Sequence, residues 1–453
     1  MREIERYLRQ ALHYFYAVRD GYPNVRRYQR EAVNHIRSML DDTMLFTALK
    51  KILGHAYHTT EYYRNAWNDR NITPDAINDF SDIRGLPFLT KGILQSEKDR
   101  MVSEMYKSQL ETSYTGGSSG NPTPFYRNKA CTAMRMGRQL GILEFCGYNT
   151  GDRCGLIWGA HGDLDLSSGV NLKKRLRKFA SGKETLCCTV MNEAQMEKYH
   201  RQLVKLNPTV LYGYPNAMTE FARYIKDNRL DPLGVKKIFC TAERLSQAQR
   251  KFLSQVFGGE VFNLYCTREH GCIGFECREH NGLHIDTGSV YLEIIVDNES
   301  VINKKGEIVI TDLLNYGMPF IRNKIGDMGV ISNKDCACGC RLPMLERFDG
   351  RVADMLYRND GKMVSGLMLL DMLADVPEIE WLQVVQKTLT DFDLFLVVNQ
   401  GFNQDIDQLV RKEMYGFFTH DVTINIHLVP EIPRNLNSGK FQEVICQIHP
   451  NVL

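Results

Sequence analysis

Short apolar segments alternate with amphipathic helical segments from residue 153 to residue 266 of this chain. Strands are expected in RCGLIWG, TVLYGY, VKKIFCT and EVFNLYC, and helices in EAQMEKYHRQLVKL, NAMTEFARYIKD and LSQAQRKFLSQVF. Alternation of this kind is typical of βαβ units, in which helices cover a largely parallel sheet. The pattern therefore predicts an α/β fold for the central part of the chain.

The segments on either side have different patterns. Residues 1 to about 110 are expected to be mainly helical, and SVYLEIIV, GEIVITDL and MGVIS make the chain β-rich after about residue 284. Residues 350–453 then mix strands such as IEWLQVVQ and TINIHLVP with the helix DIDQLVRKEMYGFF. We expect a large multi-sheet α/β N-terminal domain, 1–349, and a small α+β C-terminal lid domain, 350–453, with the boundary at RFDGRVADML.

Composition excludes several classes of protein. The 453 residues are 43% apolar and 24% charged, which is ordinary for a globular protein, and the net charge of +2 gives no footprint for nucleic acid. No apolar run reaches the roughly 18 residues of a membrane span, so no membrane association is expected.

The N-terminal segment and the cysteines bear on packing and location. Ile4, Leu8, Leu12 and Phe15 recur at helical spacing, which predicts an amphipathic helix packed on the body rather than a signal peptide. Thirteen cysteines, an odd number, without a secretion signal favour the cytoplasm, where thiols stay reduced.

The stretch SYTGGSSGNPTPFY, residues 113–126, is too rich in glycine and proline to form a helix. One interpretation is a flexible linker. The other is a loop whose backbone N–H groups and hydroxyls approach a phosphate closely. Its spacing is not G-x-x-x-x-G-K-[ST], so it is not the usual strand–loop–helix nucleotide site.

Six segments, in this order, resemble motifs of the adenylate-forming superfamily, nearest to its phenylacetate–CoA ligase and capsule-biosynthesis branch. They are TGGSSG, FCTAERL, NLYCTREHG, MPFIRNKIGDMG, DGRVADM and NSGKFQEVI. The resemblance covers nearly the whole chain, from AYHTTEYYRNAW to SGKFQEVI, and its strength lies in the order of segments that are individually weak.

The resemblance implies an ATP site. The β- and γ-phosphates would be held by the loop Thr115, Gly116, Gly117, Ser118, Ser119 and Gly120. Ala242 and Glu243 would border the adenosine, and Tyr265 would stack on adenine. Asp327 would bind the ribose, since a carboxylate accepts hydrogen bonds from both hydroxyls.

Three further residues would carry the catalytic work. Glu269 would hold Mg²⁺, Arg351 at the hinge would contact the ribose and phosphate, and Lys440 would bridge the acid and the α-phosphate. The sequence departs from the family at Asn121, where a lysine is usual, and at Cys266, where glycine is usual. Arg268 stands where the family has a small or apolar residue, and Ala353 stands where it often has an aspartate.

The reaction implied is activation of a small carboxylic acid with ATP, followed by transfer to CoA with release of AMP and pyrophosphate. One alternative acceptor is an amine or the phosphopantetheine arm of a carrier protein, and another reading is an inactive zinc-stapled scaffold. A homodimer is a further expectation. Aromatic side chains at strand ends would suit an aromatic acid or belong to the core; they are Trp158, Tyr212 and Tyr214.

GFECREHNGLH and DCACGC supply thiols and imidazoles at the short spacings of structural zinc sites. The resemblance implies that Zn²⁺ is bound by Cys277, His284, Cys336 and Cys338. Other residues nearby could substitute as ligands, namely Cys340, Cys272, His270 and His280. The simpler alternative is a loop of reduced thiols.

Overall fold

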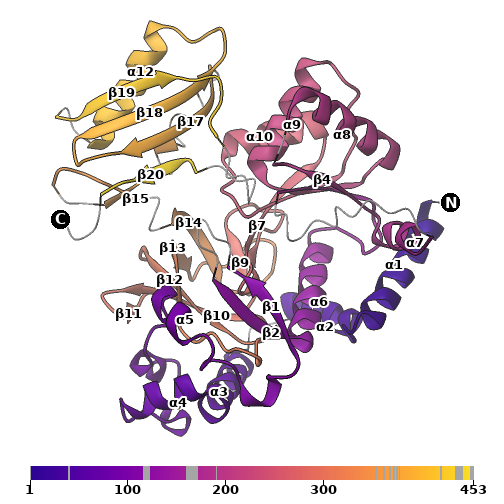
Figure 1. Cartoon of the computed structure of the whole chain (residues 1–453), viewed down its shortest axis with the longest axis vertical. Coiled ribbons are helices and arrows are strands. Elements are labelled where there is room, and N and C mark those ends of the chain that lie inside the picture. Colours follow the sequence, from indigo (N-terminus) through magenta and orange to yellow (C-terminus); the bar gives the residue numbers. More distant parts are fainter. Residues whose placement is uncertain are drawn as a thin grey trace.

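The computed structural model shows a large α/β body with a smaller domain at one side of it (Figure 1). It describes residues 2–38, 41–115, 123–159, 172–189, 191–351, 355–360, 363–366, 369–370, 373, 376, 378–418, 421–433 and 442–448. The architecture is the mixed α/β fold with a small C-terminal domain that the sequence predicts.

One sheet of twelve strands forms the frame of the body, in the order β11-β10-β12-β13-β14-β9-β8-β7-β6-β5-β3-β4. Its parallel half holds β4 (Lys183–Cys187), β3 (Cys154–Trp158), β5 (Val210–Gly213), β6 (Lys237–Thr241) and β7 (Glu260–Thr267). The antiparallel half holds β8 (Gly271–Phe275), β9 (Leu283–Ile285), β14 (Met344–Arg351), β13 (Asn323–Ser332), β12 (Gly306–Asp312), β10 (Val290–Val296) and β11 (Glu299–Ser300). Pairing changes from parallel to antiparallel at β7.

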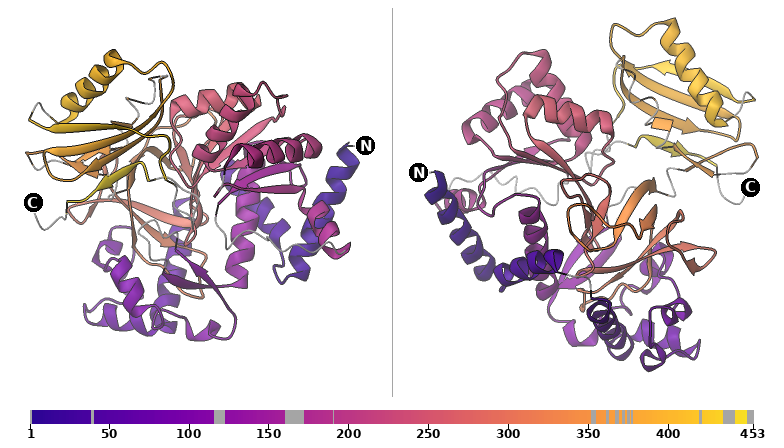
Figure 2. Two further views of the ribbon diagram at one scale, coloured as in Figure 1. Left: turned by 45° about the horizontal axis from the view of Figure 1, so that its top comes forward. Right: turned by 180° about the vertical axis from the view of Figure 1, so that it is seen from behind.

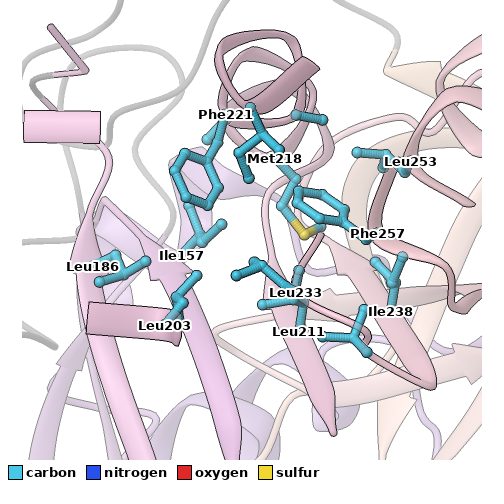
Figure 3. Close-up of a cluster of buried hydrophobic side chains, with 14 of the residues drawn as sticks. Ile157, Leu186, Leu203, Leu211, Met218, Phe221, Leu233, Ile238, Leu253 and Phe257 are labelled. Atoms are coloured by element: carbon cyan, nitrogen blue, oxygen red, sulfur yellow. The ribbon is translucent and has the colours of Figure 1, made fainter. Parts of the chain in front are cut away.

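Helices connect the parallel strands, as the alternation predicts: α8 (Glu193–Leu206), α9 (Pro215–Asp227) and α10 (Gln247–Phe257). Their apolar faces meet the sheet in a buried cluster that includes Leu203, Leu211, Met218, Phe221 and Phe257 (Figure 3). Burying a side chain of this size stabilises the fold by about 1.5–3 kcal/mol relative to leaving it exposed. The core therefore fixes the positions of the carboxyl ends of β3, β5 and β6.

The first part of the chain is helical, with α1 (Arg2–Arg19), α2 (Val25–Arg37), α3 (Asp42–Thr59), α4 (Glu61–Asn68) and α5 (Lys91–Glu97). Short 3₁₀ turns lie at Pro74–Ala76, Asp82–Gly85 and Glu104–Tyr106. The hairpin of β1 (Leu110–Tyr114) and β2 (Pro124–Asn128) then leads into α6 (Lys129–Phe145), and α7 (Leu172–Ser181) precedes β4.

The expected packing of the first helix is wrong. Ile4, Leu8 and Phe15 of α1 are exposed, and the helix instead buries Arg9 and Ala17 against the body. The Nε of Arg9 donates a hydrogen bond to the Gly151 carbonyl at 2.7 Å. A polar and small-residue face thus attaches α1, and its most apolar face points to solvent.

The C-terminal domain has its own sheet and core. The sheet order is β19-β18-β17-β20, with β17 (Ile379–Gln386), β18 (Asp391–Val398), β19 (Thr423–Leu428) and β20 (Val444–Cys446). Helix α12 (Gln404–Phe418) covers one face through Val410, Met414 and Phe418. The hairpin of β15 (Met355–Tyr357) and β16 (Met363–Ser365) lies beside β20. The exact division near residue 350 stays a prediction.

Within the described part of the chain, no helix combines the length and the apolar character that crossing a bilayer requires.

Two glycines of α6 set how closely it packs on α2. A Cβ at Gly137 would lie 2.7 Å from the Val25 carbonyl oxygen, and one at Gly141 would lie 2.6 Å from the Ala32 Cβ. We expect Gly137→Ala to destabilise the body by about 1–3 kcal/mol, because the helices must separate. Urea unfolding measures this change.

The matched control is Gly54→Ala in α3, where an added Cβ has nothing within 4 Å. That change should stabilise by up to about 1 kcal/mol, since alanine is the better helix former. Equal effects at both positions would contradict the close packing of α2 on α6.

Candidate functional site

The parallel strands end at one edge of the sheet, and several residues predicted to bind the nucleotide lie there. Ala242 and Glu243 follow β6 directly, and Tyr265 lies near the end of β7. Ala242 has φ of 68°, a left-handed conformation that is uncommon for a residue with a side chain and tends to occur at functional sites. In sheets of this kind, ligands bind outside the carboxyl ends of the strands.

The antiparallel half of the sheet curls so far that its distant strands meet. β8, β9 and β14 separate β7 from β13, which would place these two strands roughly 19 Å apart in a flat sheet. Instead, the Tyr265 hydroxyl donates a hydrogen bond of 2.5 Å to Oδ2 of Asp327 in β13. Arg351, at the end of β14, is the backbone partner opposite Asp327. The structure thus brings together Tyr265, Asp327 and the backbone of Arg351.

Aromatic packing supports the same corner. The rings of Tyr265 and Phe348 of β14 lie 4.8 Å apart, and both Tyr265 and Asp327 are buried. A buried carboxylate is costly unless it accepts hydrogen bonds, so the tyrosine hydroxyl stabilises its charged form.

Glu269 lies in the turn between β7 and β8, and a buried polar network anchors this turn. The backbone N–H of His270 donates to Thr267 Oγ1 at 3.1 Å, and His270 Nδ1 lies 3.4 Å from Asp312 Oδ2. Asp312 also forms a buried ion pair with Arg135 of α6. Burial opposes ionisation of Asp312, but the Arg135 guanidinium outweighs it and lowers the pKa of that carboxyl.

Sequence reasoning missed this network. Its signal is Arg135 and Arg138 three residues apart in the helix CTAMRMGRQLGILEF, each paired with a buried aspartate at or just after the end of a strand. Buried charges of this kind need a partner, so two arginines inside an apolar helix could have indicated acids on a facing element.

The predicted phosphate loop begins at the tip of the β1–β2 hairpin. The N–H of Thr115 donates to the Thr123 carbonyl, and the N–H of Thr123 donates to Thr115 Oγ1, both at 2.9 Å. Thr115 and Thr123 therefore close the neck of the loop. Gly116, Gly117, Ser118, Ser119 and Gly120 lie outside the described residues.

Lys440 also lies outside the described residues, but the chain three residues later is close to the body. Asn216 Nδ2 donates to Glu443 Oε1 at 3.5 Å, and the Asn216 N–H donates to Glu243 Oε2 at 3.3 Å. The start of β20 thus approaches the segment predicted to border the adenosine.

A second contact joins the two domains. The Arg223 guanidinium of α9 lies 4.8 Å from the Trp381 ring centroid of β17, and its Nη2 donates to the Glu380 carbonyl at 2.8 Å. Beside them is a cavity of about 410 Å³ lined by residues of both domains, among them Arg244 and Phe252.

The three predicted aromatic residues lie together. The rings of Trp158 and Tyr214 are 4.6 Å apart, and those of Trp158 and Tyr212 are 6.1 Å apart. Tyr214 belongs to the core, whereas Trp158 and Tyr212 are only partly buried. Cys266, at the position where the family has glycine, is the cross-strand partner of Cys272, and a hydrogen bond from that thiol lowers the pKa of Cys266.

The four residues predicted to bind metal form one cluster. The ligand atoms of Cys277, His284, Cys336 and Cys338 all lie within 4.8 Å of one another. Cys277 Sγ is 3.6 Å from Cys336 Sγ, and Cys338 Sγ is 3.3 Å from His284 Nε2. Sulfur ligands about 2.3 Å from a tetrahedral zinc ion would be about 3.8 Å apart, so these spacings fit such an ion.

The histidine is oriented for this role. His284 Nδ1 lies 3.4 Å from the Leu342 carbonyl oxygen, which fixes the proton there and leaves Nε2 as a lone-pair donor. Burial lowers the pKa of His284 and so keeps the imidazole neutral, the form that binds metal.

The substitute ligands named from the sequence lie elsewhere. Cys340 is buried in an apolar cluster with Leu342. Its backbone N–H donates to Cys338 Sγ, one of the four predicted metal-binding atoms, at 3.4 Å. His270 contacts Asp312, and His280 Nδ1 lies 3.2 Å from Glu276.

Comparisons with known proteins agree with the fold of a large α/β body and a small C-terminal domain. Residues 356–447 match the family described as the CapK C-terminal domain. Protein CapK of Staphylococcus aureus is 23% identical over 90% of this chain and 90% of its own length. Phenylacetate-coenzyme A ligase of Thermus thermophilus is 23% identical over 81% of this chain and 83% of its own. A structure of 2-hydroxyisobutyryl-CoA ligase in the postadenylation state, 16% identical, superposes with a TM-score of 0.73 over 91% of this chain and 90% of that one.

The relatives and the fold support the resemblance to the adenylate-forming superfamily, among proteins named CapK and phenylacetate-coenzyme A ligase.

The cysteine cluster predicts that purified protein holds one metal ion per chain. We expect Cys336→Ser and Cys338→Ser to release this ion and to lower Tm by several degrees, because metal binding contributes directly to folding. Cys340→Ser is the matched control: it should keep the metal, since Cys340 lies outside the group of four side chains. Elemental analysis and thermal unfolding measure both effects, and a metal-free wild-type protein would contradict the prediction.

Proposed function

We propose that the protein activates a carboxylic acid with ATP as an acyl-adenylate and then transfers the acyl group to CoA, releasing AMP and pyrophosphate. The observation that carries the proposal is the hydrogen bond between Tyr265 and Asp327, with Arg351 opposite Asp327 in register. These residues come from three separate motifs of the sequence, and each has a nucleotide-binding role in the resemblance. Their meeting at one corner supports a shared ligand.

We assign the roles as follows. Tyr265 would stack on adenine, the carboxylate of Asp327 would accept hydrogen bonds from the ribose, and Ala242 and Glu243 would border the adenosine. Thr115 and the glycine- and serine-rich loop that follows it would hold the β- and γ-phosphates through backbone N–H groups and hydroxyls. Arg351 would contact the ribose and phosphate.

Adenylation brings an anionic carboxylate to an anionic triphosphate, so charge must be neutralised and the reacting atoms aligned. Lys440 would supply a cation between the acid and the α-phosphate. Glu269 fits a magnesium ligand, because a hard oxygen donor is what Mg²⁺ prefers and the His270–Asp312 contact fixes its turn. Mg²⁺ would offset phosphate charge when bound.

The contacts between the domains support use of one site in two steps. Among the described residues, the Arg223–Trp381 and Asn216–Glu443 contacts each involve a polar or charged group, which water can solvate when the C-terminal domain turns away. Such a turn would remove Lys440 and admit the thiol of CoA.

Trp158 and Tyr212 are proposed to line the acyl pocket, and their rings would suit an aromatic acid. The Cys277–His284–Cys336–Cys338 cluster is proposed to hold structural Zn²⁺, since four ligands leave no position for substrate. The expected compartment is the cytoplasm, where these thiols stay reduced.

An ATP–pyrophosphate exchange screen over a panel of carboxylic acids tests the activation step. AMP release with CoA, with amines and with a carrier protein then identifies the acceptor. Exchange with some acid and release that depends on CoA would support the proposal. Amine-dependent release would change the acceptor, and no exchange with any acid would indicate an inactive scaffold.

Lys440→Ala should remove adenylation but spare thioester formation from a supplied acyl-adenylate. Loss of a preorganised charge commonly raises a barrier by roughly 3 kcal/mol, which is about a hundredfold in rate. Pyrophosphate exchange and CoA consumption measure the two half-reactions separately. An equal loss in both would contradict the role assigned to Lys440.

Gly117→Val should raise the KM for ATP more than Ser119→Ala. A β-branched side chain narrows the backbone choices and blocks the phosphate, whereas loss of one hydroxyl costs roughly 0.5–1.5 kcal/mol. Asn121→Lys should lower the KM for ATP, because it adds the charge that the family usually has. Kinetics with ATP varied at saturating acid measure all three variants, and unchanged ATP kinetics in Gly117→Val would make the stretch a linker.

A further inference from the structure

Helix α9 lies between the core of the body and the C-terminal domain, which sits beside α9 and α10 (Figures 1 and 2). One side of the helix is buried in the core through Met218, Phe221 and Ile225. The other side lines the cavity of about 410 Å³ between the domains, through Thr219, Arg223, Lys226 and Asp227. Because these positions recur at steps of three and four, they share one face of the helix. Helix α9 therefore presents a polar face to the C-terminal domain.

Arg223 contacts the C-terminal domain in three ways. Its guanidinium lies 4.8 Å from the Trp381 ring centroid, and its Nη2 donates to the Glu380 carbonyl at 2.8 Å. Its Nη1 forms an ion pair with Glu380 Oε2 at 3.8 Å. A guanidinium can make these contacts together because its planar fork stacks on a ring and donates at its edge. Both partners stand at the start of β17, so this one side chain fixes that strand relative to α9.

Asn216, near the start of α9, relates this orientation to the nucleotide edge. Its side chain is buried, and its Oδ1 accepts a hydrogen bond of 2.6 Å from Gln249 Nε2. Its Nδ2 donates to Glu443 Oε1 at 3.5 Å, and its backbone N–H donates to Glu243 Oε2 at 3.3 Å. Glu443 lies three residues after Lys440. With the domains in this orientation, the segment after the lysine therefore lies beside the predicted adenosine border.

Two features show that the orientation is held but not locked. Burial lowers the pKa of the Arg223 guanidinium, and this effect outweighs the opposite effect of the carboxylates of Glu380, Glu220 and Asp227. Keeping the cation out of water therefore costs more than these carboxylates offset, so the ring and the carbonyl are needed as well. Beside the contact, the cavity leaves the two surfaces incompletely packed, whereas protein interiors are close-packed.

We propose that Arg223 is a positioning residue, which holds the C-terminal domain in the orientation for adenylation and releases it for transfer to CoA, an assignment that rests on the proposed function. In the held orientation Lys440 would be supplied to the nucleotide. When the domain turns, water solvates the guanidinium and compensates for the lost ring and carbonyl. The two orientations then differ little in free energy, as a domain that moves in every catalytic cycle requires.

Arg223→Gln removes the charge and the ring contact but keeps a long polar side chain. It should slow ATP–pyrophosphate exchange about tenfold, the size expected for loss of a desolvated cation–π contact. Thioester formation from a supplied acyl-adenylate should be unchanged or faster. Arg223→Lys keeps the charge and should retain most of the exchange rate. An equal loss in both half-reactions would overturn the proposal, because a general structural defect lowers both.

Lys226→Gln is the matched control. Lys226 lines the same cavity, but its ammonium contacts the ring of Phe252 in the body, at 5.4 Å. The ratio of the two half-reaction rates should therefore stay at the wild-type value. A loss of exchange like that of Arg223→Gln would overturn the assignment, because charge in the cavity rather than the contact between domains would then be responsible.

Trp381→Leu tests the other side of the contact. It should slow exchange as Arg223→Gln does, and the double variant should be no slower than either single variant, because all three lack the same contact. Losses that multiply in the double variant would overturn the pairing of Arg223 with Trp381.

Small-angle X-ray scattering of the whole chain, without substrate, measures the orientation independently of the reaction. The wild-type curve should match the arrangement of the two domains in Figure 1. Arg223→Gln should shift the curve towards a different arrangement, and Lys226→Gln should not. If no acid supports exchange, the proposed function fails, while the scattering still tests whether Arg223 holds the domain. Identical curves for the wild type and Arg223→Gln would overturn the proposal.

Discussion

The hydrogen bond from Tyr265 to Asp327 can form only because the antiparallel half of the sheet curls through three intervening strands. The curl depends on the change of pairing at β7. On its parallel side β7 is held by helical crossovers, which keep the sheet open and twisted. On its antiparallel side β8, β9 and β14 fold back over a buried apolar cluster, which places β13 across from β7. The nucleotide corner is therefore a product of topology, and its residues are far apart in the sequence.

Much of this arrangement follows from the sequence because it rests on local patterns. The alternation before residue 267 predicts β3, β5, β6 and β7 with the three helices between them, and IEWLQVVQ coincides with β17. The convergence of Cys277, His284, Cys336 and Cys338 is also predicted, because the resemblance implies this group, and their role as metal ligands stays a prediction. Spacing alone cannot tell which of the three alternate thiols turns into the core, so the choice over Cys340 came from the resemblance, and the structure agrees with it. The roles of the predicted nucleotide residues stay predictions.

The failures have a common physical origin. Periodicity shows that α1 has an apolar face, but it does not show which surface meets that face. The expectation that Ile4 and Phe15 pack on the body is therefore wrong, since both are exposed. The sequence pattern does not predict helix α6, because its two close-packing glycines and its buried arginines weaken the apolar periodicity. Arg135 and Asp312 can be recognised as an ion pair only once the fold brings α6 to the end of β12.

The cysteine cluster has a consequence for how the chain reaches its fold. Cys277 follows β8, His284 lies in β9, and the other two cysteines lie between β13 and β14. The chain from His284 to Cys336 must therefore close into a loop before all four side chains can coordinate an ion. A bound ion would then act as a removable cross-link that restricts the unfolded ensemble, much as a disulfide does. Long-range closure of this kind is slow to form. Metal supply would thus govern how long newly made chains remain partly folded. A shortage of metal would lower the yield of folded protein and leave its catalytic constants unchanged.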